Sequence, residues 1–351
     1  MGDTFPRLKG AVVQAAPVFL DRDATVAKAC RFIEQAADLG AQVVVFPECY
    51  IPAYPHWFAF YTVAHPLTMR FYKELFKNAV VAPSPATDQI GQAAKKARAF
   101  VVMGINEKEA NSYGTLYNTF LFFSADGELL GKHRKLTPTV QERMVHTGGD
   151  GSTLEVFHTV YGGLSGLICA ENFNPLARFA LLAKGEVIHA AGWPAFPLAP
   201  PLNETRDIRK KLTPAPPSLA YRVRSQAAEG KVFVLSSSGV FTEEMKDAME
   251  LDEAARKQFV SDGASSCIVN PQGQFLVEPD VHGETVLCAD LDIEEVVASK
   301  YIVDITGHYN RFDVFTLNVN RSTHYPISET SDLESQALSP DTDYMEQPEI
   351  D

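Results

Sequence analysis

The chain has 351 residues, of which 46% are hydrophobic and 21% charged, a composition typical of a globular protein with a large core. Its formal net charge of −13 argues against nucleic acid or an anionic membrane as a partner. No apolar run is long enough to cross a bilayer, and the first residues lack the apolar segment of a secretory signal. Five widely spaced cysteines without a CxxC motif predict reduced thiols, a cytoplasmic location and no zinc framework.

Hydrophobic periodicity predicts alternating strands and helices in the first half of the chain. The run 43–46 is apolar and mostly β-branched, which is typical of a strand buried on both faces. Asp126-Gly127 lies between two apolar runs and is a strong hairpin signal. The expected strands are 8–15, 43–46, 100–105, 118–123 and 128–132, and the expected helices are 23–39 and 88–98.

The second half repeats this alternation. Asn174 and Pro175 favour the start of a helix, and Gly185 favours its end. A second hairpin is expected at residues 270–273. The remaining elements are expected as strands 164–168, 187–190, 231–236 and 283–291 and a helix over 218–229. Helices alternating with strands, with hairpins among them, predict a layered α/β domain with mixed sheets.

Two segments differ from the rest. Residues 195–217 carry many prolines around a charged patch, and we expect a long ordered surface loop of the kind that is often functional. Residues 327–351 are acidic, Ser-rich and nearly devoid of apolar residues, a composition that predicts disorder. The expected organisation is one domain over 1–326 followed by this tail.

Cys169 lies between an apolar strand and a helix start, where a positive local field favours thiolate over thiol. Glu48 and Lys135 also follow predicted strands, where open α/β sheets place their ligands. Taken singly, these residues are better explained as a buried inert cysteine, a loop glutamate and a solvated lysine. Glu142 is spaced to pair with Lys135 or with its neighbour Arg143.

Together the three groups provide a thiol nucleophile, a carboxylate base and a cation for developing negative charge. None of the nine histidines has metal-ligand spacing. His133 is expected to be a surface side chain, with a supporting role behind Lys135 as the alternative. The residues therefore predict thiol-dependent acyl or imidoyl transfer that uses neither a metal nor a cofactor.

Three motifs in this order resemble those of the nitrilase superfamily, and its nitrilase branch in particular: FPE at 46–48, GKHRKLTPT at 131–139 and GLICAENFNPLAR at 166–178. The runs at 142–157 and 307–315 resemble the nitrilase branch as well. The resemblance implies that Glu48 is the general base, Lys135 the charge stabiliser, Cys169 the nucleophile and Glu142 a structural carboxylate that orients the lysine.

For the fold, the resemblance implies a four-layer αββα sandwich with mixed sheets. It also implies a homodimer whose interface contains the helix after the nucleophile, and larger or spiral oligomers. Two positions depart from the pattern: many relatives have Trp where this chain has Ala170, and RPDV where it has 311–314. A small residue beside the nucleophile is expected to affect the substrate size that the pocket accepts.

Aromatic residues are common near these motifs, and pockets for small organic ligands are mostly apolar and aromatic. We expect Tyr54, Trp193 and Phe196 to lie nearest the substrate, together with Ala170; core packing is the alternative for each. The expected activity is hydrolysis of an organic nitrile to a carboxylic acid and ammonia through a Cys169 thioimidate and acyl thioester, with amide as a possible by-product.

The alternatives are an amidase, carbamoylase or cyanide-converting enzyme of the same superfamily and, from a different class, an inactive filament or scaffold protein. The runs at 142–157 and 307–315 argue against an amidase or carbamoylase. The intact set of four polar residues argues against an inactive protein. The sequence leaves open which nitrile is the substrate, the acid-to-amide ratio, the oligomer size and the pathway.

Overall fold

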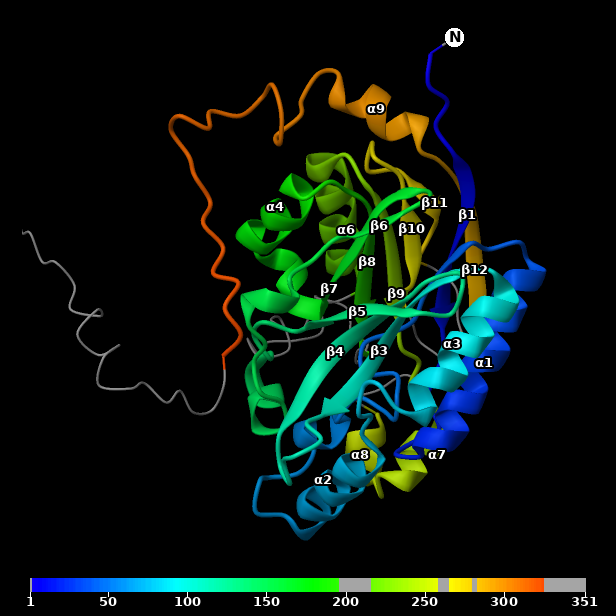
Figure 1. Ribbon diagram of the computed structural model, residues 1–351. Coiled ribbons are helices and arrows are strands. Elements are labelled where there is room, and N and C mark those ends of the chain that lie inside the picture. The colour runs from blue at the N-terminus through cyan, green and yellow to red at the C-terminus, as the bar shows by residue number, and fades with distance from the viewer. Residues whose placement is uncertain (1, 196–215, 258–264, 280–282, 325–351) are drawn as a thin grey trace, which may run out of the picture.

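The computed structural model describes residues 2–195, 216–257, 265–279 and 283–324, and in these ranges the chain forms two six-stranded mixed sheets (Figure 1). The first sheet has the order β12-β1-β2-β3-β4-β5. Its strands are β12 (Thr285–Asp292), β1 (Arg7–Gln14), β2 (Val43–Val45), β3 (Phe100–Lys108), β4 (Leu116–Phe123) and β5 (Leu129–Arg134). The strands β1, β2 and β3 are parallel, whereas β12, β4 and β5 pair antiparallel with their neighbours.

The second sheet has the order β11-β10-β9-β8-β7-β6. Its central strands β7, β8 and β9 are parallel, and the outer pairs are antiparallel. The strands are β11 (Phe275–Val277), β10 (Cys267–Val269), β9 (Phe233–Ser238), β8 (Glu186–Trp193), β7 (Gly162–Ile168) and β6 (Phe157–Thr159).

Helices cover the outer face of each sheet. The first sheet is covered by α1 (Arg22–Asp38) and α3 (Pro85–Ala97), and the second by α4 (Pro175–Ala183) and α6 (Pro216–Gly230). The other helical elements are η1 (His56–Ala59), α2 (Pro66–Asn78), η2 (Val140–Met144), η3 (Gly151–Thr153), η4 (Cys169–Phe173), α7 (Glu243–Ala248), α8 (Glu253–Arg256) and α9 (Glu294–Lys300). The result is the expected four-layer αββα sandwich.

The alternation of side chains in β1 shows how the layers form. Leu8 and Val12 point between the two sheets, where they join a core with residues of β7, β8 and β9. Ala11 and Val13 point to the opposite face and pack against α1 and α3. Because successive residues of a strand face opposite sides, a strand buried on both faces is apolar throughout, as the sequence indicates.

The expected elements are present, with boundaries shifted by one to three residues in most cases. Asn174 caps α4 as predicted, since its side chain accepts hydrogen bonds from the amides of Leu176 and Ala177. The helix α2 was not expected, although Pro66 at its first position is a start signal. The proline-rich segment 196–215 and the tail 327–351 lie outside the described residues, as does Phe196.

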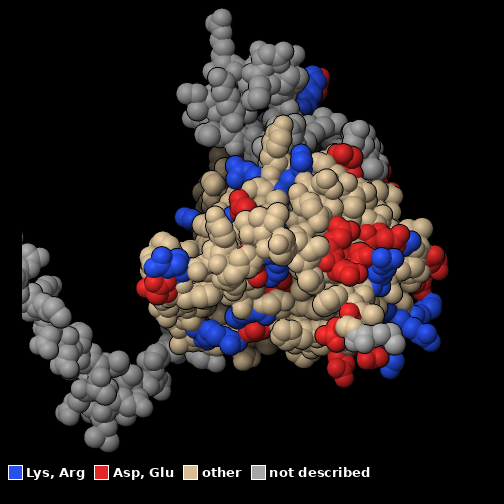
Figure 2. All heavy atoms as spheres, turned by 90° about the horizontal axis from the view of Figure 1, so that it is seen from above, with Lys and Arg blue, Asp and Glu red and all other residues tan. Residues whose placement is uncertain are grey.

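The surface carries many carboxylates, which gather in one area of the face shown in Figure 2, in keeping with the net charge of −13. Within the described ranges, none of the helices combines the length and the apolar character needed to span a bilayer.

Candidate active site

The three residues singled out from strand ends come together at one end of the two facing sheets. Glu48 lies three residues after β2, Lys135 directly follows β5, and Cys169 directly follows β7. The Lys135 ammonium lies 2.7 Å from Oε1 of Glu48 and 2.6 Å from Oε2 of Glu142. All three of these side chains are fully buried. Glu142 therefore pairs with Lys135, one of the two partners that its spacing allowed.

Asn118, on β4, was not anticipated from the sequence. Its side-chain amide donates to Oε1 of Glu48 at 2.6 Å and to Oε1 of Glu142 at 2.7 Å. Each carboxylate thus receives a hydrogen bond from an ammonium and from an amide, which offsets the cost of burying its charge. A buried polar side chain needs hydrogen-bond partners, so the Asn in the mostly apolar strand LYNTFLFF is the sequence feature that could have indicated this position.

His146 extends the cluster from the other side of Glu142. Its Nδ1 lies 3.3 Å from Oε1 of Glu142, and its Nε2 donates to Oδ1 of Asn106 at 2.8 Å. The Asn106 amide in turn donates to the carbonyls of Ile51 and Ala53. Because these carbonyls belong to the segment between Glu48 and Tyr54, the chain of contacts ties Glu142 to that segment.

The two carboxylates have different acidities. Burial raises the pKa of Glu48 to about 7, against the opposing effect of Lys135. Burial also pushes the pKa of Glu142 upward, but the adjacent His146 ring and the charge of Lys135 outweigh it and lower this pKa to about 2. Among the described residues, Oε2 of Glu48 is buried without a hydrogen-bond partner. Glu48 is thus suited to exchange protons near neutral pH, and Glu142 to remain charged beside Lys135.

Cys169 occupies a sharp turn between β7 and η4, with φ of 53°. A non-glycine residue in the left-handed region is uncommon and is often found where a side chain has a functional role. Burial and the Glu48 carboxylate raise the pKa of the Cys169 thiol well above its ordinary value, although Lys135 acts in the opposite direction. Burial thus opposes the local field that favours the thiolate, and the thiol needs a base to ionise.

Buried side chains hold the turn through its backbone. Asn172 donates to the carbonyls of Leu167 and Cys169, both at 3.0 Å, and accepts from His189 Nε2 at 2.8 Å. The Nδ1 atom of His189 lies 2.6 Å from the Glu186 carboxylate. These groups form a second polar network that does not include the lysine.

Two glycines allow the segment of Glu48 to pass close to both sheets. A Cβ atom on Gly104 would lie 1.9 Å from the Pro47 carbonyl oxygen, which is a severe overlap. A Cβ atom on Gly192 would lie 2.3 Å from the Phe120 ring and 3.2 Å from the Glu48 amide nitrogen. The close approach of the backbones therefore requires glycine at both positions.

The structure places three of the four predicted substrate contacts. Tyr54 is half-buried, and burial together with the charges of Glu142 and Glu48 raises the pKa of its phenol well above the ordinary value. Trp193 is buried at the end of β8, and the residue before it pairs with Ile168. Ala170 lines a cavity of about 270 Å³ together with residues 136–140 and the start of α4.

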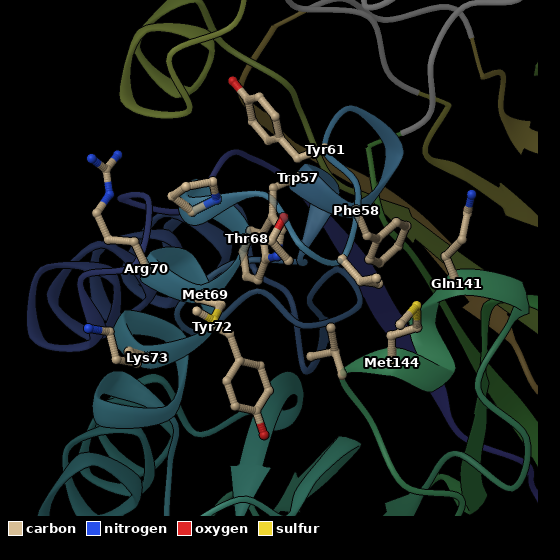
Figure 3. Close-up of a pocket in the computed structure, with 13 residues that line it drawn as sticks. Trp57, Phe58, Tyr61, Thr68, Met69, Arg70, Tyr72, Lys73, Gln141 and Met144 are labelled. Carbon is tan, nitrogen blue, oxygen red and sulfur yellow. The ribbon is translucent and has the colours of Figure 1, made fainter.

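An apolar cavity of about 570 Å³ is also present, and Figure 3 shows its lining residues. It is formed by η1, α2 and η2, with Trp57, Phe58, Met69 and Met144 among its lining residues. None of Glu48, Lys135, Glu142 and Cys169 lines it. The cavity is therefore separate from the polar cluster, although Gln141 and Met144 on its wall are close neighbours of Glu142 in sequence.

Comparison with known proteins shows the family to which the chain belongs. The model of the family described as carbon-nitrogen hydrolase matches residues 9–301, so the chain belongs to the carbon-nitrogen hydrolase family. It is similar to Nitrilase 3 of an unknown prokaryotic organism, with 36% identity over 322 residues that cover 92% of this chain and 93% of the relative.

The chain is also similar to the bifunctional nitrilase/nitrile hydratase NIT4B of Nicotiana tabacum, with 35% identity over 97% of this chain and 94% of the relative. Among solved structures, the carbon-nitrogen hydrolase from Helicobacter pylori G27 has a TM-score of 0.65 at 20% identity and covers 84% of this chain and 92% of that one. The resemblance to the nitrilase superfamily and the expected fold are both confirmed.

Proposed function

We propose that this protein is a nitrilase that converts an organic nitrile to a carboxylic acid and ammonia, with Cys169 as the nucleophile. The observation that carries the proposal is the buried Lys135 ammonium held between the carboxylates of Glu48 and Glu142, next to a cysteine on a strained turn. Relatives with 35–36% identity over more than nine-tenths of the chain bear nitrilase names, which supports nitriles as the substrate class.

In the first step, Glu48 takes the Cys169 proton while Sγ bonds to the nitrile carbon. One π bond of the nitrile breaks, and the nitrogen receives this proton from Glu48 to give a thioimidate, which leaves Glu48 ionised again. The Lys135 ammonium stabilises the negative charge that develops on the nitrogen, in a site without competing solvent. Glu142 and Asn118 hold the lysine in place and do not contact the reacting atoms.

In the next steps, Glu48 takes a proton from water as the oxygen adds to the thioimidate carbon. The resulting tetrahedral intermediate loses ammonia as the C=O bond forms, which leaves an acyl thioester on Cys169. A second water, activated in the same way, releases the acid and restores the thiol. The total is one nitrile and two waters converted to one acid and one ammonia.

An amide forms if the tetrahedral intermediate expels the thiol instead of ammonia. The printed name of the tobacco relative combines both reactions, which makes the amide a product to be measured in this protein as well. The ratio of acid to amide depends on which leaving group is protonated, and hence on the position of the intermediate relative to Glu48 and Lys135.

The test is incubation of the purified protein with a panel of aliphatic, arylaliphatic and aromatic nitriles, cyanide and the matching amides, followed by measurement of ammonia, acid and amide. We expect nitriles to be turned over and amides to be poor substrates. Cys169→Ala is expected to remove turnover, whereas the control Cys288→Ala, at a half-buried position on β12, keeps it. Turnover by Cys169→Ala, or a preference for amides, would contradict the proposal.

The substrate contacts, assembly and location are part of the same proposal. Tyr54, Trp193 and Ala170 form the substrate side of the site.

A homodimer through α4 is supported by Leu176, which is exposed on this helix and borders an apolar hollow of about 550 Å³. Analytical ultracentrifugation of Leu176→Glu is expected to show dissociation. Five unpaired thiols suit a reducing compartment such as the cytoplasm.

A further inference from the structure

The carboxylate of Glu171 joins the two backbone segments that carry the proposed nucleophile and the lysine. Its Oε2 accepts a hydrogen bond from the Ile168 amide at 2.9 Å, and its Oε1 accepts one from the Leu136 amide at 2.6 Å. Ile168 directly precedes Cys169, and Leu136 directly follows Lys135. One buried side chain thus fastens the end of β5 to the turn after β7.

His133 completes this arrangement, and it is not the surface residue expected from the sequence. Its side chain is only 2% exposed, with Nε2 at 3.1 Å from Oε2 of Glu171 and Nδ1 at 3.2 Å from the carbonyl oxygen of Thr153. A carbonyl oxygen can only accept a hydrogen bond. The Glu171 carboxylate already accepts from two amides, so it also faces the ring as an acceptor.

Both ring nitrogens of His133 therefore need a hydrogen, which only the imidazolium form provides. Burial lowers the pKa of His133, but the charge and hydrogen bond of Glu171 outweigh this effect and raise the pKa above its ordinary value. The two lines of argument agree on a buried ion pair between His133 and Glu171.

The surroundings of His133 contain no competing charge among the described residues that face it. Its backbone pairs with Phe120 of β4, the group facing it from η3 is the Thr153 carbonyl, and the group from η4 is Glu171. The flanking residues of β5, Lys132 and Arg134, point to the other side of the sheet and pair with Glu107. Glu171 is thus the charged partner of the imidazolium.

We propose that the His133–Glu171 ion pair positions Lys135, which follows β5, relative to the Cys169 turn. The inference rests on the proposed function, because it assumes that both residues take part in the reaction. His133 and Glu171 are positioning residues, since they act through the Leu136 and Ile168 amides and not on the substrate.

The proposal predicts a dependence on pH with a defined sign. A histidine whose pKa is raised by folding keeps its stabilising proton below that pKa and loses it as the pH rises through it. The neutral ring then leaves one nitrogen lone pair facing an acceptor, and the Glu171 carboxylate loses its counter-ion. The turn relaxes, and kcat falls on the alkaline side with little change in KM.

The first test compares His133→Gln with His158→Gln, which makes the same change at an exposed histidine of β6. A displacement of about 1 Å at the reacting atoms can cost on the order of a hundredfold in rate. We therefore expect His133→Gln to lower kcat by about tenfold to a hundredfold. KM should stay within about twofold, and the alkaline fall expected for the wild type should be absent. His158→Gln is expected to match the wild type.

Glu171→Asp is the second variant, and it tests the proposal even where His133→Gln does not fold. The shorter side chain keeps the charge next to His133 but no longer reaches both amides. A lowered kcat with the alkaline fall retained is expected. Wild-type kcat and pH profile in either variant would overturn the inference. With Cys169→Ala inactive, that result would leave the proposed function in place, whereas activity of Cys169→Ala would reject the function itself.

Discussion

The two halves of the site are held together by different kinds of contact. Lys135 is fixed through its side chain, by two carboxylates that lie within 2.7 Å of its ammonium. The turn at Cys169 is fixed through its backbone, by the hydrogen bonds of Glu171 and Asn172 to the amides and carbonyls on either side. The Lys135 ammonium is thus positioned by other charges, whereas Cys169 is positioned by hydrogen bonds to the main chain around it.

The largest effect is expected from Lys135→Met, which removes the charge from the first half. Two buried carboxylates would be left without their cation, and breaking a buried ion pair costs about 3–5 kcal/mol of stability. Activity should be lost and the thermal midpoint lowered, as measured by nitrile turnover and calorimetry. Lys132→Met, a change on the same strand at a lysine outside the cluster, is the control and should keep its activity. Substantial activity in Lys135→Met would remove the lysine from the mechanism.

Asn172→Ala weakens the second half and leaves the charges untouched. Because two carbonyls of the turn lose their donor, we expect kcat to fall by about tenfold or more with little change in KM. The control is Asn174→Ala, which removes the cap of α4 and should cost about 1 kcal/mol of stability while kcat is kept. Equal kinetic effects of the two substitutions would mean that the turn is not specifically held by Asn172.

The pH dependence on the acid side reports on Glu48 in the first half. This carboxyl has a pKa of about 7 and must be ionised to act as a base. The value of kcat/KM should therefore rise with pH up to about 7, and at one unit below it should be about tenfold lower. The same raised pKa means that stability falls as the pH rises from about 4.5 to about 7. A flat profile over this range would contradict the assignment of Glu48.

Ala170→Trp probes the outer side of the turn, where the effect should be smaller. If the cavity of about 270 Å³ accepts the indole, the backbone contacts are kept and the preference between small and bulky nitriles changes. Overpacking would instead cost about 1–3 kcal/mol with unchanged preference. Rates on two nitriles and the thermal midpoint of the same variant distinguish these outcomes, and the second would exclude Ala170 from substrate selection.

Truncation after residue 326 should have the smallest effect. The sequence 327–351 has few apolar residues and contains none of the residues proposed for the site. Catalysis by the monodisperse truncated protein is therefore expected to match the full chain. Loss of both folding and turnover would show that the segment belongs to the domain.

The sequence was sufficient to predict the strand ends that carry Glu48 and Cys169, because buried strands in parallel sheets are apolar runs. The strand before Lys135 was predicted from the hairpin signal at Asp126-Gly127. The sequence did not reveal Asn118 or Asn172, since neither a polar residue in a mostly apolar strand nor one in a short 3-10 turn produces a periodic pattern. The expectation for His133 was wrong for a reason that the strand pattern contains: Lys132 and Arg134 point to one side of β5, so the residue between them points to the other.

For Cys169, the local sequence indicates the direction of the helix field but not the depth of burial that acts against it. Desolvation is the largest influence on this thiol, and it depends on residues distant in the chain. The surroundings of Phe196 lie outside the described residues, so the prediction for this side chain remains a prediction.

The close passage of the Glu48 segment over Gly104 and Gly192 has a consequence for engineering. A single added methyl group at either position meets backbone or ring atoms at less than 2.5 Å. Libraries of variants that change Gly104 or Gly192 should therefore contain almost no active clones. Ala170, in contrast, borders a cavity, so a larger side chain has room there. Substitutions that keep the fold intact are therefore best sought around Ala170, with both glycines kept constant.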